Sequence, residues 1–224
     1  MFENEEAEPF HPLLGIVTGL AAEARLARPL GRVEIGGGWP AGAEAAAERL
    51  VAGGAGALLS FGLAGGLNPA LAAGAVVVPA AVLAGGRRFS TDATLAARFG
   101  AIAGLLLAGE TVLATLADKQ AAFRETGALA VDLESGAVAR VAARHRLPFA
   151  VLRVVCDPAG RALPPAALAA LDSQGAIGAW RVLASVLAHP RQIAALLALA
   201  GDAARARRAL GACVKMIPSG RETS

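Results

Sequence analysis

The sequence between Leu50 and Gly86 contains no charged residue, and this stretch limits most strongly what the chain can fold into. A run this apolar raises the question of a membrane-spanning helix, which needs about 20 continuous apolar residues. Glycine and proline interrupt the run too often for such a helix. The interruptions are Gly53-Gly54, Gly65-Gly66, Asn68-Pro69 and Pro79. We therefore predict several buried strands joined by tight turns.

The composition is typical of a folded protein. Of the 224 residues, 55% are hydrophobic and 17% are charged, with a mean hydropathy of +0.54. A disordered chain has the opposite balance, and this length predicts one domain over residues 1–224 with a flexible tail at 1–11. The net charge of +3 is scattered without aromatic interleaving, so we expect no nucleic-acid partner. The acidic start, Met1–Glu8, lacks the features of a signal peptide and predicts a cytoplasmic location.

Short apolar runs alternate with segments of helical spacing along the chain. The expected strands cover residues 13–18, 32–35, 57–61, 74–79, 102–107, 129–131 and 149–155. The expected helices cover residues 21–30, 43–51, 114–126 and 135–146, followed by a helical region at 165–210 that breaks at Pro190 and Gly201. We predict a glycine-rich turn at 62–66, and an exposed position for Lys119 on its helix. The alternation predicts an α/β sandwich with a parallel or mixed sheet.

Polar residues follow the ends of several expected strands. In open α/β sheets the ligand binds at the carboxyl ends of the strands, so these residues mark a candidate site. They are Glu23, the glycine-rich segment 62–66, Glu110, Asp132, Glu134 and Asp157. Most of them are carboxylates in a chain that has few charges. The pattern therefore favours chemistry that depends on acid and base groups.

Four short motifs carry a resemblance to a known family. They are Gly19-Leu20-Ala21-Ala22-Glu23-Ala24, Phe61-Gly62-Leu63-Ala64-Gly65-Gly66-Leu67, Val131-Asp132-Leu133-Glu134-Ser135 and Val155-Cys156-Asp157. In this order they resemble the nucleoside phosphorylase and nucleosidase superfamily, which includes methylthioadenosine/S-adenosylhomocysteine nucleosidase. The resemblance implies a three-layer α/β/α sandwich with a mixed central sheet, and an enzyme that cleaves the N-glycosidic bond of a purine nucleoside. The segment from Asp157 to Pro165 is similar to the hopanoid-associated phosphorylase branch.

The resemblance implies two catalytic residues. Asp157 would protonate N7 of adenine, which leaves poorly as an anion, and Glu23 would take a proton from the attacking water. Glu134 would bind the ribose hydroxyls. Asp132 points to the same face, where a binding role and a structural role both remain open.

The remaining expected site residues contact the base or let the ligand approach the backbone. Gly65 allows a close approach, with Ala64 beside it, and Leu133 completes the ribose side. Leu113 would contact the base through its backbone. Val112 stands where related nucleosidases carry a stacking aromatic residue, and Cys156 stands where the family usually has Ser.

Water and phosphate both remain possible nucleophiles. A carboxylate at Glu23 repels a phosphate dianion, which favours hydrolysis. Phosphate as a co-substrate would need cations, for which the candidates are Arg87 and Arg88 with Ser90 and Thr91. We expect no metal and no other cofactor. A membrane-surface binding protein without catalysis is the alternative from another functional class.

The apolar helical region near the carboxyl end bears on the substrate. Its large apolar residues are Trp180, Leu183, Val186, Leu187, Ile193, Leu196, Leu197 and Leu199. They either pack the core or line a channel for a lipid tail, flanked by arginines that could contact anionic headgroups at a membrane surface. The segment between Pro79 and Ile102 is short, which leaves the 5′ side of the nucleoside open. With the branch resemblance, these features favour adenosylhopane as substrate, and the family suggests a homodimer.

Overall fold

A central mixed sheet organises the protein, and the computed structural model describes residues 13–164 and 193–217 of it. The strands are β1 (Leu14–Thr18), β2 (Arg32–Ile35), β3 (Ala57–Gly66), β4 (Val76–Val77), β5 (Ala81–Ala84), β6 (Arg87–Ser90), β7 (Leu105–Ala108), β8 (Ala130–Asp132) and β9 (Phe149–Asp157). They follow the order β2-β1-β3-β8-β7-β5-β6, and β9 pairs with both β3 and β4. The pairs β1–β2, β1–β3, β3–β9, β5–β7 and β7–β8 are parallel, whereas β3–β8, β4–β9 and β5–β6 are antiparallel.

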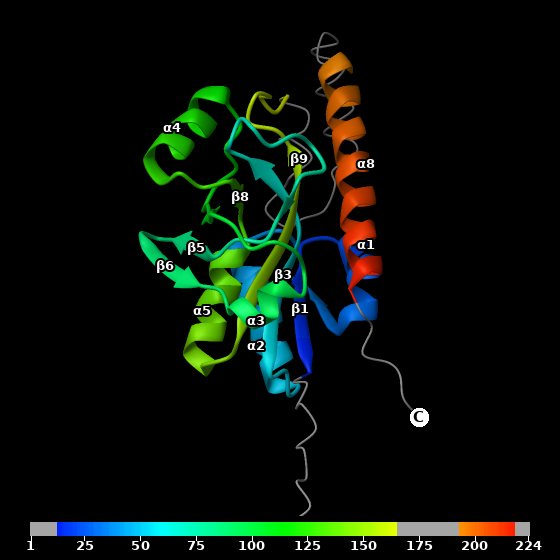
Figure 1. Cartoon of the computed structure of the whole chain (residues 1–224), viewed down its shortest axis with the longest axis vertical. Helices are drawn as coiled ribbons and strands as arrows, with labels where there is room; N and C mark the ends of the chain where they lie inside the picture. Colours follow the sequence, from blue (N-terminus) through cyan, green and yellow to red (C-terminus); the bar gives the residue numbers. More distant parts are fainter. Residues whose placement is uncertain (1–12, 165–192, 218–224) are drawn as a thin grey trace, which may run out of the picture.

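Helices cover both faces of this sheet (Figure 1). The helices α2 (Pro40–Ala52) and α5 (Ser135–His145) pack together on one face, over a core that contains Ala43, Ala47, Leu50 and Val138. On the other face lie α1 (Ala21–Ala27), a 3-10 turn (Arg28–Leu30), α3 (Ala93–Ala97) and α8 (Ile193–Met216). The helix α4 (Leu116–Thr126) packs over β7 and β8 through Ala122 and Phe123. The expected three-layer α/β/α sandwich with a mixed sheet is confirmed.

The strand β3 is longer than the sequence pattern predicts. Residues 62–66, which we expected to form a turn, continue the strand with a bulge between Ala64 and Gly65. Gly62 has φ +154°, and a side chain there would place its Cβ 2.6 Å from an Arg153 nitrogen and 2.9 Å from a Glu23 oxygen. Glycine at this position therefore lets the strand pass directly beside two buried charged groups.

A β-hairpin lies within the segment between Pro79 and Ile102, for which the sequence analysis predicted no strands. Strands β5 and β6 are joined by Gly85 and Gly86, both with positive φ, as in the tight turns that connect hairpin strands. The Gly-Gly pair between two short runs is the signal that could have predicted it.

The helix α8 runs without interruption from Ile193 to Met216, so the expected break at Gly201 is wrong. Its second half packs on the sheet through Ala206, Leu210 and Cys213, while Ile193 and Leu197 in its first half are exposed. The apolar residues expected at Trp180, Leu183, Val186 and Leu187 lie outside the described residues, as do the expected tail at 1–11 and the expected break at Pro190. Within 13–164 and 193–217, no helix is both long enough and apolar enough to cross a membrane.

Candidate active site

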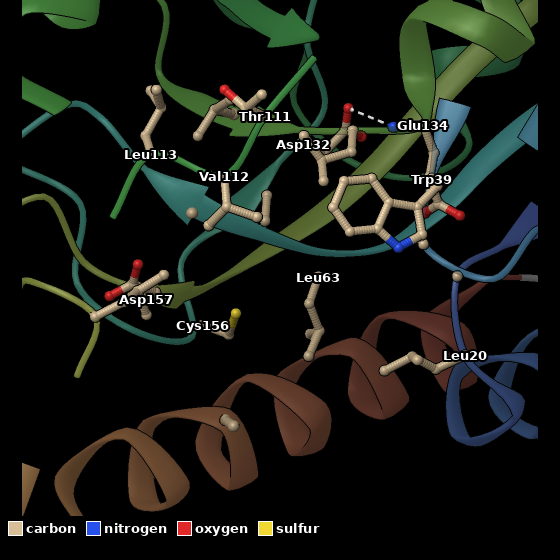
Figure 2. Close-up of a pocket in the computed structure, with 18 of the residues that line it drawn as sticks. Leu20, Trp39, Leu63, Thr111, Val112, Leu113, Asp132, Glu134, Cys156 and Asp157 are labelled. Carbon is tan, nitrogen blue, oxygen red and sulfur yellow. Dashed lines mark hydrogen bonds between the residues drawn. The ribbon is translucent and has the colours of Figure 1, made fainter. Parts of the chain in front are cut away.

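A cavity of about 490 Å³ lies where β3, β8 and β9 end, and the helix α8 runs along one side of it (Figure 2). The structure brings all ten expected site residues to its walls. They are Glu23, Ala64, Gly65, Val112, Leu113, Asp132, Leu133, Glu134, Cys156 and Asp157. Glu110, which the strand-end rule also selected, is exposed and does not line this cavity.

The Glu23 carboxylate is held by the backbone. It lies in the first turn of α1 and is 4% exposed. Its Oε2 accepts hydrogen bonds from the N–H groups of Gly19 and Leu20, each at 3.0 Å, and its Oε1 accepts one from Leu63, also at 3.0 Å. A carboxylate has about four acceptor positions, so one position on Oε1 is left for a ligand. Burial raises the pKa of Glu23, and the nearby charge of Arg153 and these three hydrogen bonds oppose that rise.

A buried arginine, Arg153, pairs with Asp132 and Glu134 and was not among the residues expected at the site. Arg153 lies in the middle of β9 and is 1% exposed. Its Nε lies 2.6 Å from Asp132 Oδ2, its Nη2 lies 3.4 Å from Glu134 Oε2, and Nη2 also donates to Ser60 Oγ at 2.7 Å. A charged residue inside the apolar run Phe149–Val155 is the sequence signal that could have found it, because such a charge needs buried partners.

Asp132 is fully occupied by neighbouring protein groups. Its Oδ1 accepts the N–H groups of Glu134 (3.3 Å, dashed in Figure 2) and Ser135 (3.1 Å), and its Oδ2 contacts Arg153 and the Ser135 hydroxyl. Of the two roles that the sequence left open, this geometry favours the structural one. Asp132 orients Arg153 and the first turn of α5.

Glu134 keeps one oxygen without a hydrogen-bond partner in the described residues. Its Oε2 contacts Arg153, whereas its Oε1 is buried in the cavity wall. Burial raises the pKa of Glu134 to about 7, helped by the negative charges of Glu23 and Asp132 and opposed by Arg153. The side chain can therefore accept hydrogen bonds from a hydroxyl and can also hold a proton near neutral pH.

Asp157, at the end of β9, has a cationic partner, Lys119, which the sequence pattern predicted to be exposed. Lys119 is 1% exposed, not on the solvent face of α4, and its Nζ lies 2.5 Å from Asp157 Oδ2. The residues three and four positions later, Ala122 and Phe123, also pack inward, so helical spacing could have indicated the buried face. Burial raises the pKa of Asp157, and the adjacent ammonium of Lys119 opposes the rise.

The rest of the cavity wall is mainly apolar. Trp39, which precedes α2, lies on the same side as Glu134, while Val112, Leu113 and Asp157 lie toward the other side (Figure 2). The Trp39 ring was not among the expected site residues, although it follows the glycine run 36–38, of which Gly37 and Gly38 also line the cavity.

Cys156 lines the cavity as a thiol, because burial and the charge of Asp157 raise its pKa to about 12. A Cβ at Gly65 would lie 3.3 Å from Val131 and 3.9 Å from Asp157 Oδ2, so glycine leaves the backbone open there. From α8, Leu199 and Ala203 reach the cavity.

The expected phosphate-binding group does not form at this cavity. Arg87, Arg88 and Ser90 lie in the β5–β6 hairpin, and none of them lines the cavity. Thr91 instead donates its hydroxyl to the carbonyl of Pro79 at 2.8 Å. Among the described lining residues, the only side-chain cation is Lys119, and Arg153 lies behind the carboxylates.

A model of the phosphorylase superfamily matches residues 32–187. The chain belongs to the phosphorylase superfamily. Membership makes it an enzyme that cleaves the glycosidic N–C bond of nucleosides, as the sequence motifs indicated. No curated protein matches the chain in sequence.

Solved structures show the same fold as this phosphorylase-superfamily chain. An S-adenosylhomocysteine nucleosidase from Streptococcus pyogenes, in complex with 5-methylthiotubericidin, is 18% identical, covers 92% of this chain and 98% of its own, and has a TM-score of 0.64. A 5′-methylthioadenosine/S-adenosylhomocysteine nucleosidase from Colwellia psychrerythraea, in complex with adenine, is 19% identical over 79% and 95% of the two chains, with a TM-score of 0.61. A futalosine hydrolase of Helicobacter pylori is 17% identical over 79% and 97%, with a TM-score of 0.62.

Proposed function

We propose that the protein hydrolyses the N-glycosidic bond of an adenine nucleoside, with Asp157 as the acid and Glu23 as the base. The observation that carries this proposal is the pair of buried carboxyl groups on one cavity, each in a different environment. Three backbone N–H groups surround Glu23 and leave one acceptor position, which suits a carboxylate that receives a proton from water. Asp157 keeps one buried oxygen, Oδ1, without a hydrogen-bond partner in the described structure.

The proposed reaction moves two protons. The bond between C1′ and N9 breaks, and its electron pair goes to the base as Asp157 transfers a proton to N7. The oxygen of water bonds to C1′ while a water proton passes to Glu23. Neutral adenine and a sugar with a free 1-hydroxyl leave, and the proton on Glu23 returns to Asp157 through solvent. The carboxylates around the sugar, with Glu134 on its hydroxyls, stabilise the oxocarbenium-like transition state.

The charges of the site support water over phosphate as the nucleophile. Four carboxyl groups, Glu23, Asp132, Glu134 and Asp157, face two cations, Lys119 and Arg153. Both cations are already bound to these carboxylates. A phosphate dianion would therefore find no unpaired cation among the described lining residues and would be repelled by the Glu23 carboxylate, whereas a neutral water molecule would not.

We propose adenosylhopane as the substrate. Two features support this substrate: the segment after Asp157 resembles the hopanoid-associated phosphorylase branch, and one wall of the cavity is apolar. Leu20, Leu63 and Leu199 line the cavity on the α8 side, and Leu197 on the same helix is 69% exposed. This surface suits a large apolar 5′ substituent, and it also allows contact of α8 with a membrane surface.

The decisive experiment measures adenine release from adenosine, methylthioadenosine, S-adenosylhomocysteine and adenosylhopane, each with and without phosphate. We expect release without phosphate, and a loss of about 10²–10⁴-fold in kcat for Asp157→Asn. Glu110→Gln, which removes an exposed carboxylate outside the cavity, is the matched control. If a sugar 1-phosphate forms, and only when phosphate is present, then phosphate and not water is the nucleophile. Absence of base release from every nucleoside would support the non-catalytic alternative.

The lipid part of the proposal has its own test. Leu199→Gln places a polar group on the apolar wall, so kcat/KM for adenosylhopane should fall by about 10-fold or more while that for adenosine changes little. Met216→Gln, exposed at the other end of α8, is the control. An equal loss on both substrates would exclude a binding role of this wall for the 5′ substituent.

A further inference from the structure

The reaction proposed above gives no task to Lys119, a charged side chain that is buried beside Asp157. Its side chain extends from α4 to the loop that follows β9 and ends beside Asp157. The Nζ donates to Asp157 Oδ2 at 2.5 Å, to the carbonyl of Arg161 at 2.8 Å and to the carbonyl of Pro158 at 3.2 Å. An ammonium group has three N–H donors, and here each one has an oxygen acceptor.

This arrangement fixes the Asp157 carboxyl group in one orientation. Lys119 occupies Oδ2, while Oδ1 is buried and has no protein partner in the described structure. Because the same ammonium also binds two backbone carbonyls, it ties the carboxyl to the loop 158–161 and to α4. The carboxyl can therefore rotate only by breaking a charged hydrogen bond, which is stronger than a neutral one.

We propose that Lys119 is a positioning residue for departure of the base: it holds Asp157 with Oδ1 directed at the leaving base. The proposal rests on the acid role of Asp157 given above. Lys119 does not touch the base itself, since its three donors are already engaged. It acts through Asp157.

The charge of Lys119 has a predictable effect on the proton affinity of the Asp157 carboxyl group. Three charged groups face Asp157 from the elements around it: Lys119 on α4, Arg161 on the following loop and Asp202 on α8. The two cations lower the pKa of Asp157, and burial and Asp202 raise it. Without Lys119 the pKa of Asp157 would be higher, so the carboxyl would stay protonated to higher pH. Transfer of the proton to N7 would still slow, because nothing on Oδ2 would keep Oδ1 directed at the base.

The test compares two leaving groups in Lys119→Met, a variant of similar length without the charge. Adenine needs a proton from Asp157 to leave, whereas the nitrophenolate of 4-nitrophenyl riboside leaves as an anion and needs none. We expect kcat for the adenine nucleoside to fall by about 10–100-fold with KM within about 2-fold. The rate with 4-nitrophenyl riboside should stay within about 2-fold of the parent. Lys215→Met, which removes the only other lysine at an exposed position, is the control.

Titration of the Asp157 carboxyl by carbon NMR, assigned with Asp157→Asn, gives a readout that does not depend on turnover. The pKa of Asp157 should be higher in Lys119→Met, and also in Lys119→Gln if the methionine variant does not fold. An unchanged pKa, or equal kinetic effects on the two substrates in a folded variant, would overturn the role of Lys119. If the parent protein releases neither adenine nor nitrophenolate, the proposed function fails instead, and the titration still decides whether Lys119 controls Asp157.

Discussion

Arg153 and Lys119 are both buried at the site, and they differ in what they hold. Arg153, in the middle of β9, contacts two carboxylates and two serine hydroxyls on the Glu134 side of the cavity. Lys119, on α4, contacts one carboxylate and two backbone carbonyls on the Asp157 side of the cavity. A planar guanidinium with several donors can join four side chains, as Arg153 does here, whereas an ammonium serves as a single charged point.

This difference separates Asp132, which is enclosed by protein donors, from Asp157, which keeps one oxygen open to the cavity. Around Arg153, the Asp132 oxygens are engaged by two backbone N–H groups, the arginine and the Ser135 hydroxyl. Around Lys119, Asp157 retains a free oxygen that borders the cavity. A carboxyl group that both pairs with a cation and faces a ligand can lose and regain its proton during a reaction.

The largest expected effect on stability comes from removing Arg153. Arg153→Met leaves the Asp132 carboxylate buried without its counter-charge and Ser60 without its donor, so the free energy of unfolding should drop by about 3–5 kcal/mol. Lys119→Met should cost less than half as much, because Asp157 can bind a proton and become neutral. Urea unfolding of both variants at neutral pH measures the two losses. Equal losses would mean that Arg153 and Lys119 are both purely structural.

A smaller effect is expected from Glu134, through pH. Its pKa rises from an ordinary value of 4.5 to about 7 on folding, so the folded state binds the proton more tightly than the unfolded state. Stability from this group therefore falls as pH rises through the window from 4.5 to about 7. In Glu134→Gln this fall should be weaker by roughly 1–3 kcal/mol.

The comparison for Glu134 uses urea unfolding of both proteins at several pH values across that window. Glu23 and Asp157, whose pKa values are also raised, are present in both proteins, so their contribution largely cancels. Parallel stability curves for the parent and the Gln variant would contradict the expectation.

The smallest effect on stability is expected from Asp202, which faces Asp157 from α8. Asp202 on α8 pairs with Arg161 at 2.6 Å and with Arg205 at 2.8 Å, and both arginines are at least one-third exposed. Asp202→Asn should lower the free energy of unfolding by less than about 1 kcal/mol, as for other ion pairs in contact with solvent. It should also lower the pKa of Asp157, because a neighbouring negative charge is removed. Glu34→Gln, which breaks the exposed pair with Arg49, is the control.

The rule that ligands bind beyond the carboxyl ends of strands worked because it depends only on where apolar runs stop. It led to Glu23, Asp132, Glu134 and Asp157, and the structure places all four on one cavity. The same rule misplaced Glu110, since a residue after a strand can turn toward solvent as easily as toward the site. The family itself was indicated by four short motifs and is confirmed by the superfamily match.

By itself, the sequence determined the alternation of strands and helices, and with it the layered fold, because hydrophobic period is a local property of the chain. It also determined that carboxylates cluster at one edge of the sheet. Only the tertiary structure decided which cation each carboxylate meets. Lys119 lies 38 positions before Asp157 in the chain, and the two meet because α4 packs over β8 beside the end of β9. Charge pairing over such distances depends on packing, and no local pattern encodes it.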